Sequence, residues 1–506
     1  MKTTITALGK LVKSTEVGQQ VLVGSLEKVI PYFESAKRTE TKVVNLKTAD
    51  QIMSEIDLLI KPNGCTSTEL LGMVDQILES SVMTQHRHFH NQLFAQCLPE
   101  AVAGEILTSV TNASMFTFEV APVFLMIEKI ILAKMKTAMG WAPGVGDGIF
   151  APGGSISNMY GMNMARYHKF PEIKQKGMGA CGNLALFQSE SGHYSINKGA
   201  ALLGLGTDAI YKVRNNKDYQ MDSGHLREQI QKARADGRTP FLINATCATT
   251  VFGSFDDLEM LADVCAQEKM WLHLDAALGG SMVLSDKHKH LMKGSHLADS
   301  ITWNPHKLLG VPLQCSAILT KHDGILSEAH AANAAYLFQK DKLNIQHDTG
   351  DKSIQCGRKV DVLKLWMAWK VQGENGFEAR IDRMMEISQY LRDEIVRRGQ
   401  KDGSLELVSE PYMSNVCFWF IPPSARGPNA PKKGTPEWRT LVSNGPVVVK
   451  ERMQETGSTM IGFQSVAIWE DESPPNFFRF TLSNPYLETT DMDYLLDQIE
   501  TLGSDL

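Results

Sequence analysis

The sequence lacks the features of several protein classes. None of its eight cysteines forms a CxxC pair, and none stands at a Cys/His spacing typical of zinc, which argues against a disulfide framework or a metal site. Lys and Arg number 51 against 57 Asp and Glu, so the net charge of −6 gives no basic excess for binding nucleic acid or anionic membranes. Fixed-period repeats and low-complexity tracts are missing too, which excludes a solenoid.

Long hydrophobic runs are also missing. Residues 120–139 come nearest, but four charged residues interrupt them and the apolar residues recur at helical spacing, which predicts a buried amphipathic helix. The first residues, MKTTITALGKLVKSTEVG, hold no apolar core long enough for a secretion signal. We therefore expect a cytoplasmic protein with neither a membrane nor a nucleic acid as partner.

The 506 residues, 43% of them hydrophobic, suffice for roughly two to four domains and a large core. Residues 1–93 predict an N-terminal helical segment. Between 94 and 370, short apolar runs alternate with helical patterns, which predicts a large α/β domain with a mainly parallel sheet. Residues 371–506 predict a smaller α+β domain. The expected strands are 184–187, 240–246, 271–277, 300–304 and 315–319, then 416–421, 460–464 and 476–482.

Ligands of such sheets bind at the carboxyl ends of the strands, so the residues there carry the functional signal. Residues 152–158, PGGSISN, open a predicted helix and can hold a phosphate, although a plain helix cap is commoner. They match neither GxxxxGK[ST] nor GxGxxG, which disfavours ATP and NAD. His193 follows the strand 184–187, where a neutral imidazole can stack on a flat ring or serve as an ordinary hydrogen-bonded histidine.

Two further residues follow buried strands. Asp275 ends a largely apolar strand, and a buried carboxylate needs a cation, either a protonated pyridine nitrogen or an Arg or Lys side chain. Lys307 stands in Asn-Pro-His-Lys, residues 304–307, between two apolar runs. Lysine is the side chain that forms an imine with an aldehyde, and the alternative is a surface lysine.

These motifs together resemble a known family. Asn-Pro-His-Lys, Asp-Ala-Ala beginning 32 residues before the lysine, and a histidine 82 residues before that aspartate are similar to group II pyridoxal-phosphate (PLP) decarboxylases. The resemblance runs from about Phe89 to the C-terminus. It is closest to the acidic amino-acid branch, with glutamate and cysteine sulfinate decarboxylases. It implies a fold-type I enzyme with an aspartate aminotransferase-like large domain, an N-terminal helical segment and a small C-terminal α+β domain.

The resemblance implies a role for each matching residue. Lys307 would hold PLP through an imine, His193 would stack on its ring, and Asp275 would pair with the ring nitrogen. Tyr336 matches the tyrosine of a mobile loop that protonates Cα after CO2 leaves. In the family this loop reaches the active site of the other subunit, which implies a homodimer with active sites at the interface. The other implied cofactor contacts are Ala277, Thr250, Ser155, Ile156, Asn304 and His306.

The resemblance also bears on the substrate. Arg479 matches the arginine that binds the distal acid group in the acidic branch, and Gln92 matches a helper glutamine. Ser114 is typical of the sulfinate enzymes and Phe116 of the glutamate enzymes. Likeness at residues 199–208 and 420–427 favours cysteine sulfinate, giving hypotaurine, with aspartate or cysteate as further candidates. The alternative is a glutamate decarboxylase making GABA.

Several positions depart from the branch. Leu278 replaces the usual Trp, His90 replaces the usual Phe, and residues 85–88 add further imidazoles. These are either packing substitutions or changes to the pocket. Two rival functions use the same fold: an aminotransferase, which the Tyr336 loop disfavours, and an inactive scaffold, which the complete set of reactive residues disfavours.

Overall fold

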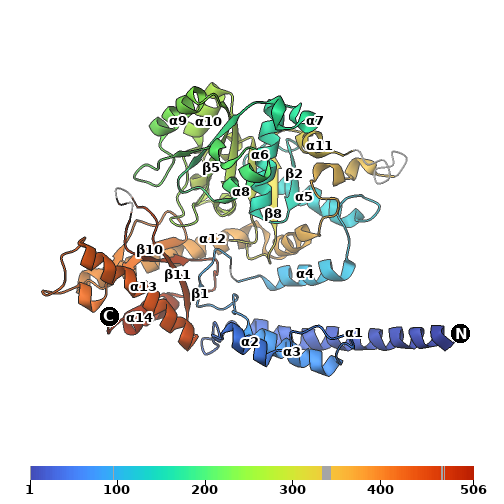
Figure 1. Ribbon diagram of the computed structural model, residues 1–506, viewed down its shortest axis with the longest axis horizontal. Coiled ribbons are helices and arrows are strands. Elements are labelled where there is room, and N and C mark those ends of the chain that lie inside the picture. Colours follow the sequence, from blue (N-terminus) through green and yellow to red (C-terminus); the bar gives the residue numbers. More distant parts are fainter. Residues whose placement is uncertain (1, 95, 333–342, 469–470, 472) are drawn as a thin grey trace.

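The computed structural model describes residues 2–94, 96–332, 343–468, 471 and 473–506, with side chains from residue 15 onward. Its centre is a seven-stranded sheet in the order β2-β8-β7-β6-β5-β3-β4 (Figure 1). Strand β8 is antiparallel to both of its neighbours, and the remaining pairs are parallel, as predicted. The strands are β2 (Asp147–Ala151), β3 (Leu184–Ser189), β4 (Ile210–Val213), β5 (Thr239–Thr246), β6 (Trp271–Ala276), β7 (Ser300–Trp303) and β8 (Ser316–Thr320).

Helices cover both faces of this sheet, which explains why its central strands are almost continuously apolar. Every residue of β3, β6 and β7 is buried. One face packs against α6 (Gly154–Lys169), α8 (Ser195–Leu202) and α11 (Ile325–His330). The other packs against α5 (Pro122–Ala138), α9 (Ser223–Ala235), α10 (Leu258–Glu268) and α12 (Asp361–Asp402). Helix α5 confirms the amphipathic helix expected within 120–139.

A five-stranded sheet, ordered β1-β11-β12-β10-β9, forms the C-terminal part. Its strands are β1 (Phe89–His90), β9 (Leu405–Leu407), β10 (Asn415–Phe420), β11 (Met460–Gln464) and β12 (Phe477–Thr481), and it carries α13 (Pro436–Thr456) and α14 (Thr489–Leu502). Strand β1 comes from the N-terminal segment and pairs in parallel with β11. The sequence pattern did not predict this pairing.

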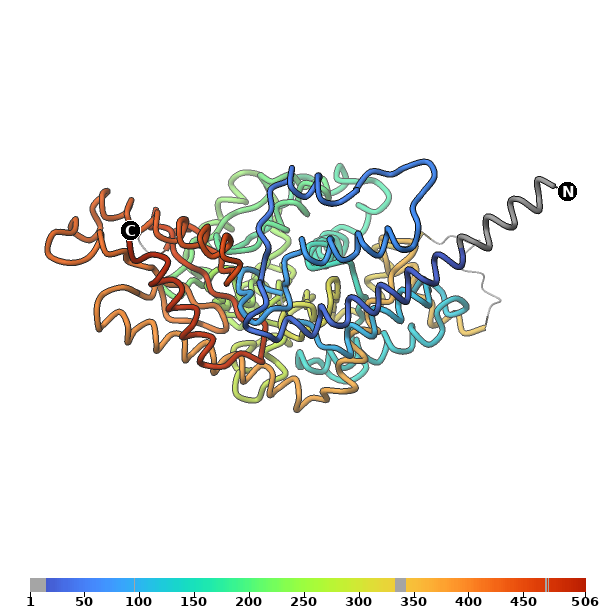
Figure 2. Tube along the Cα trace, turned by 90° about the horizontal axis from the view of Figure 1, so that it is seen from below, coloured from blue at the N-terminus to red at the C-terminus, as the bar shows by residue number. Residues whose placement is uncertain are grey.

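The N-terminal helices are α1 (Lys2–Ser35), α2 (Ala49–Glu55) and α3 (Ser67–Ser80), followed by α4 (Pro99–Thr111). Helices α1 and α3 lie side by side below the sheet (Figures 1 and 2), joined by an ion pair of 2.7 Å between Lys28 and Asp75. Helix α12 crosses the predicted boundary at 370/371 and changes direction at Gly373. The boundaries at 93/94 and 370/371 stay predictions. Among the described helices, none has both the length and the hydropathy that crossing a bilayer requires.

Candidate active site

A cavity opens at the carboxyl ends of the central strands of the large sheet. His193 follows β3, Thr250 follows β5, Asp275 ends β6, and Lys307 follows β7, so the parallel topology brings four distant segments together. The start of α6 closes one side of the cavity. The lining residues are Gly154, Ser155, Asn158, His193, Thr246, Ala248, Thr250, Asp275, Ala277, Leu278, Asn304 and Lys307.

Asp275 is a buried carboxylate, only 5% exposed. It accepts hydrogen bonds from Asn158 Nδ2 at 2.9 Å and from the amide of Ala277 at 3.3 Å. Within the described part of the chain it forms no ion pair. A carboxylate in this setting is ready for a cationic ligand, because hydrogen bonds alone compensate only part of the cost of its burial.

Lys307 and His193 line the same cavity as Asp275. Lys307 is half-buried, and burial lowers the pKa of its amine, although the carboxylate of Asp275 opposes the shift. A lowered pKa leaves more of the amine unprotonated and therefore nucleophilic. Burial likewise lowers the pKa of His193, whose Nδ1 accepts the amide hydrogen of Ser195 at 3.2 Å. At neutral pH the imidazole is thus neutral and oriented, as stacking on a ring requires.

The first turn of α6 provides a site for an anion. Gly153 has φ +91°, which favours glycine, and a Cβ on Gly154 would lie 2.6 Å from Asn304 Nδ2. The N-terminus of this 16-residue helix therefore reaches the cavity with its exposed Ser155. Ile156 and His306, both predicted contacts, do not line the cavity. The amide of Ile156 donates to the carbonyl of Gly153 at 3.1 Å, and His306 Nδ1 lies 2.6 Å from the carbonyl oxygen of Cys315.

Sequence reasoning assigned no role to the lining residues Thr246 and Ala248, included Gly154 and Asn158 only as members of the PGGSISN motif, and treated Leu278 only as a departure. Asn158 had a usable signal. It stands four residues after Gly154, so both lie on the same face of the helix that the PGGSISN motif opens. No sequence signal could have predicted the backbone of Ala248, because its φ of +70° is a conformation that alanine rarely adopts.

Arg479 lies on β12 beside the cavity wall. Its Nη1 donates to the carbonyl of Thr250 at 3.3 Å and its Nη2 to the carbonyl of Asn91 at 3.1 Å, while its buried Nε has no hydrogen-bond partner. Burial lowers the pKa of Arg479. A second cation, Lys450, has its amine 3.4 Å from Asn91 Oδ1. No carboxylate of the described residues forms an ion pair with either cation.

Other predicted substrate residues lie outside the cavity lining. The carbonyl of Gln92 accepts a hydrogen bond of 2.8 Å from Thr481, close to Arg479 in sequence. Ser114 has a buried Oγ without a hydrogen-bond partner, and the carbonyl of Phe116 accepts the amides of Thr349 and Gly350 at 3.0 Å. Ser114 and Phe116 thus pack on the segment that follows residues 333–342. Tyr336 lies outside the described residues.

The extra histidines pack between the N-terminal segment and the C-terminal part. His88 stacks on Tyr494 with ring centroids 4.4 Å apart and lies 3.2 Å from Asp491 Oδ1. His90 packs on Phe480, and its burial lowers the pKa of the imidazole to about 3. Their positions favour the packing interpretation of these substitutions.

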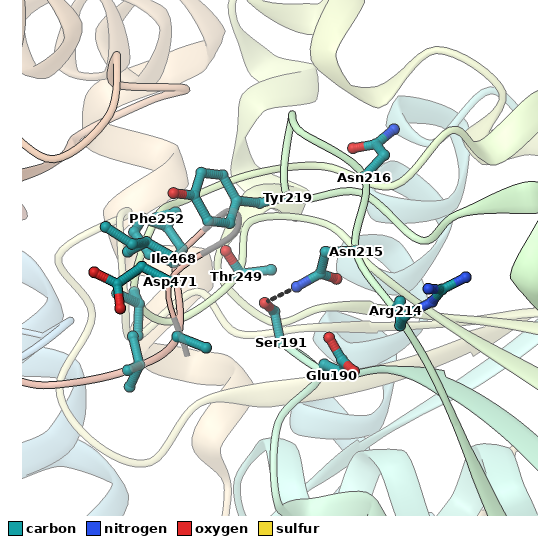
Figure 3. A pocket seen from close by; sticks show the side chains of 13 residues that line it. Glu190, Ser191, Arg214, Asn215, Asn216, Tyr219, Thr249, Phe252, Ile468 and Asp471 are labelled. Atoms are coloured by element: carbon teal, nitrogen blue, oxygen red, sulfur yellow. Dashed lines mark hydrogen bonds between the residues drawn. The ribbon is translucent and has the colours of Figure 1, made fainter. Parts of the chain in front are cut away.

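A larger cavity of about 550 Å³ opens on the other side of the loops that carry His193 and Thr250. Figure 3 shows its polar wall, where Asn215 Nδ2 donates to Ser191 Oγ at 2.7 Å. Asp471 lines it too and is paired with Arg439 at 2.8 Å. This cavity contains neither the lysine nor the buried carboxylate, so the chemistry belongs to the smaller one.

Known proteins match this arrangement over most of the chain. The model of the pyridoxal-dependent decarboxylase conserved domain matches residues 50–421. The chain belongs to this family. Human cysteine sulfinic acid decarboxylase is 46% identical over 467 residues, which cover 92% of both proteins. Acidic amino acid decarboxylase GADL1 of Xenopus tropicalis is 44% identical, covering 92% of this chain and 88% of that protein.

Solved structures confirm the fold of this pyridoxal-dependent decarboxylase. The crystal structure of mouse CSAD superposes with a TM-score of 0.91 at 43% identity, covering 98% of this chain and 99% of that one. Catharanthus roseus tryptophan decarboxylase, at 20% identity, shares the fold with a TM-score of 0.82 over 98% of this chain and 99% of that one. The predicted family, fold-type I architecture, lyase class and PLP cofactor are therefore confirmed.

The residues of the cavity fit PLP. A buried carboxylate without a cation suits a protonated ring nitrogen, and an amine with a lowered pKa suits an aldehyde. The N-terminus of α6, held close to Asn304 by Gly154, suits a phosphate.

Proposed function

We propose that this decarboxylase removes the α-carboxylate of a small acidic L-amino acid, with cysteine sulfinate first and aspartate or cysteate as further substrates. The observation that carries the proposal is the position of the Arg479 guanidinium and its lack of an acidic partner among the described residues. Its half-buried guanidinium lies against Thr250 of the cavity wall, has a free Nε and forms no ion pair with a described carboxylate. Guanidinium binds carboxylate or sulfinate oxygens in a bidentate manner, so Arg479 selects an acidic side chain. The names of the relatives support the same class.

Each residue of the cavity then has a task. Lys307 would hold PLP through its amine, and Asp275 would accept the hydrogen of the ring nitrogen. His193 would stack on the ring, Ala277 would pack on the ring face, and Thr250 would lie near the phenolic oxygen. When bound, PLP supplies an electron sink for the bond between Cα and the carboxylate. The phosphate contacts are assigned to the backbone at Ser155 and Ile156 with Asn304 and His306, and two of these residues, Ser155 and Asn304, line the cavity.

The proton that replaces CO2 at Cα is assigned to Tyr336, by the family resemblance. Protonation at Cα gives the amine, whereas a proton delivered to the cofactor instead would leave the amino group there and release an aldehyde, so the position of this donor decides which product forms. Gln92, close to Arg479, is assigned to the acid group of the substrate.

The site is completed, we propose, by a second copy of the chain. Ser114 and Phe116 do not line the cavity of their own chain, and they pack beside the segment that follows residues 333–342. Large apolar side chains are exposed on the neighbouring helices, among them Val110 (69%) and Ile130 (62%). A homodimer would cover this apolar surface and bring these residues to the other active site. None of the eight cysteines, all of which lie in the described residues, forms a disulfide, which supports a reducing compartment such as the cytoplasm.

A side-by-side assay tests the proposed substrate. Catalytic efficiency is measured with L-cysteine sulfinate, L-cysteate, L-aspartate and L-glutamate, and CO2, amine and keto acid are quantified separately. We expect CO2 and amine in equal amounts, with the highest efficiency for cysteine sulfinate. A preference for glutamate would reassign the substrate, and stoichiometric keto acid without CO2 would refute the decarboxylation of these acids.

A further inference from the structure

A chain of buried polar side chains leads through the protein interior to Asp275. Trp271 Nε1 lies 2.8 Å from Ser300 Oγ, and Ser300 Oγ lies 2.8 Å from His273 Nδ1. His273 Nε2 lies 3.1 Å from Asn158 Oδ1, and Asn158 Nδ2 lies 2.9 Å from Asp275 Oδ2. None of the five residues is more than 5% exposed. Trp271, His273 and Asp275 alternate along β6, so all three side chains point to the same face of the sheet.

The two ends of this chain fix the direction of its hydrogen bonds. An indole nitrogen can only donate, and an ionised carboxylate can only accept. Ser300 therefore accepts from Trp271 and donates to His273 Nδ1. The imidazole carries its hydrogen on Nε2 and donates to Asn158 Oδ1, which leaves Asn158 Nδ2 to donate to Asp275. If these hydrogen bonds ran in the opposite direction, the hydroxyl hydrogen of Ser300 would have no acceptor among the five side chains.

Two neighbouring contacts hold the middle of the chain in place. The second hydrogen of Asn158 Nδ2 points to Ser195 Oγ at 2.9 Å, which sets the orientation of the amide. A Cβ on Gly161 would come within 2.5 Å of the His273 ring, so α6 packs directly on the imidazole. Burial lowers the pKa of His273 to about 4, so the ring is neutral at pH 7 and keeps the tautomer that the chain needs.

We propose that Trp271, Ser300, His273 and Asn158 are positioning residues that hold Asp275 as an oriented, ionised carboxylate facing the ring nitrogen of PLP. This inference rests on the role proposed for Asp275. A chain of donors that all point one way stabilises a carboxylate more than separate contacts do, because each hydrogen bond polarises the next.

The test uses holoenzyme variants and two readouts, the dissociation constant of PLP and the visible absorbance of the Lys307-bound cofactor. Asn158→Leu should weaken PLP binding about tenfold or more, the factor expected for losing one hydrogen bond to a charged group, and should change the spectrum. His273→Leu should act in the same direction, and His273→Gln should recover part of the loss because its amide can still donate. Trp271→Phe should weaken binding by about two- to fivefold, since it removes only the terminal neutral hydrogen bond.

Trp303→Phe is the matched control. Trp303 Nε1 donates to Ser281 Oγ at 2.9 Å, so this variant removes an equally buried Trp–Ser bond on the neighbouring strand, outside the chain. It should leave both readouts unchanged. Thermal melting of each apoenzyme shows whether it is folded, and if Asn158→Leu is not, the His273 and Trp271 variants decide.

The variant Asp275→Asn distinguishes a failure of the positioning chain from a failure of the role proposed for Asp275. If it changes both readouts while the folded Asn158, His273 and Trp271 variants keep the wild-type values, the positioning chain is refuted and the role of Asp275 stands. If Asp275→Asn also leaves both readouts unchanged, the proposed role of Asp275 fails and the positioning chain falls with it.

Discussion

The two sheets contribute opposite unpaired charges to the site. The large sheet contributes Asp275, a buried carboxylate that accepts two hydrogen bonds, and the small sheet contributes Arg479, a half-buried guanidinium with a free Nε. Within the described chain, neither forms an ion pair. By contrast, Arg358 and Glu128, each 3% exposed, pair at 2.6 Å. An unpaired buried charge is energetically costly. The paired Arg358 and Glu128 therefore have a structural role, whereas the unpaired Asp275 and Arg479 are available to bind ligands.

The division also separates two tasks. In the proposed site, the residues of the large sheet would hold the cofactor, whereas the cations near β12 would face the substrate side chain. Variants on the large sheet should therefore affect the cofactor, and variants on the small sheet should affect the choice of substrate.

The largest effect is expected for Lys307→Ala. The variant loses the amine that binds the aldehyde, so it should lose visible absorbance and turnover to the limit of detection. Borohydride reduction of wild-type holoenzyme, followed by peptide mapping, should place the cofactor on Lys307. Labelling of another lysine would overturn the assignment of the whole large-sheet site.

The second largest effect is expected for Arg479→Ala. It should lower kcat/KM on cysteine sulfinate about a hundredfold or more, because a desolvated acid group loses its partner, at a cost of about 3 kcal/mol. PLP should stay bound with an unchanged spectrum. Arg392→Ala, which removes a partly exposed arginine paired with Glu410, is the control. Loss of PLP from the Arg479 variant would break the division between the two sheets.

Lys450→Met should have a smaller effect in the same direction. The amine lies beside Asn91, the residue that also contacts Arg479, and methionine keeps most of the aliphatic stem. We expect KM for acidic substrates to rise about three- to tenfold with little change in kcat, in line with roughly 1 kcal/mol for a partly exposed charge. Steady-state kinetics check this, with Lys433→Met as a surface control. An unchanged KM would assign substrate recognition to Arg479 without Lys450.

The last prediction concerns stability and not turnover. The pKa of His90 is about 3 in the folded chain and about 6.5 when unfolded, so below pH 6.5 the unfolded state binds an extra proton. The free energy of unfolding should therefore fall by about 1.4 kcal/mol per pH unit between pH 6.5 and 3 from this residue alone. His90→Phe should remove that contribution. Urea unfolding at pH 7 and pH 5 measures it, with the exposed His290→Ala as control. Equal pH dependence in His90→Phe and wild type would contradict the prediction.

The sequence alone predicted the central strands well because burial on both faces makes them nearly continuous apolar runs, as in β5 and β6. It missed β2 and β4, which are short and hold glycine or charged residues. Strand β1 was missed because its partner β11 lies at the far end of the chain, and local periodicity carries no signal for such a pairing. The helical spacing from Gly154 could have placed Asn158 beside the cavity, but its hydrogen bonds could not be predicted, because its partners Asp275 and His273 come together only in the folded sheet.

The pairing of β1 with β11 has a consequence for biosynthesis. Phe89 leaves the ribosome long before its partner Met460, which is added roughly 370 residues later, so the edge of the small sheet must wait for almost the whole polypeptide. Until then the segment around His86, His88 and His90 has no C-terminal neighbours to bury it. A nascent chain of this enzyme therefore exposes, near its beginning, a segment that is buried in the folded protein. A chaperone can bind this segment during translation.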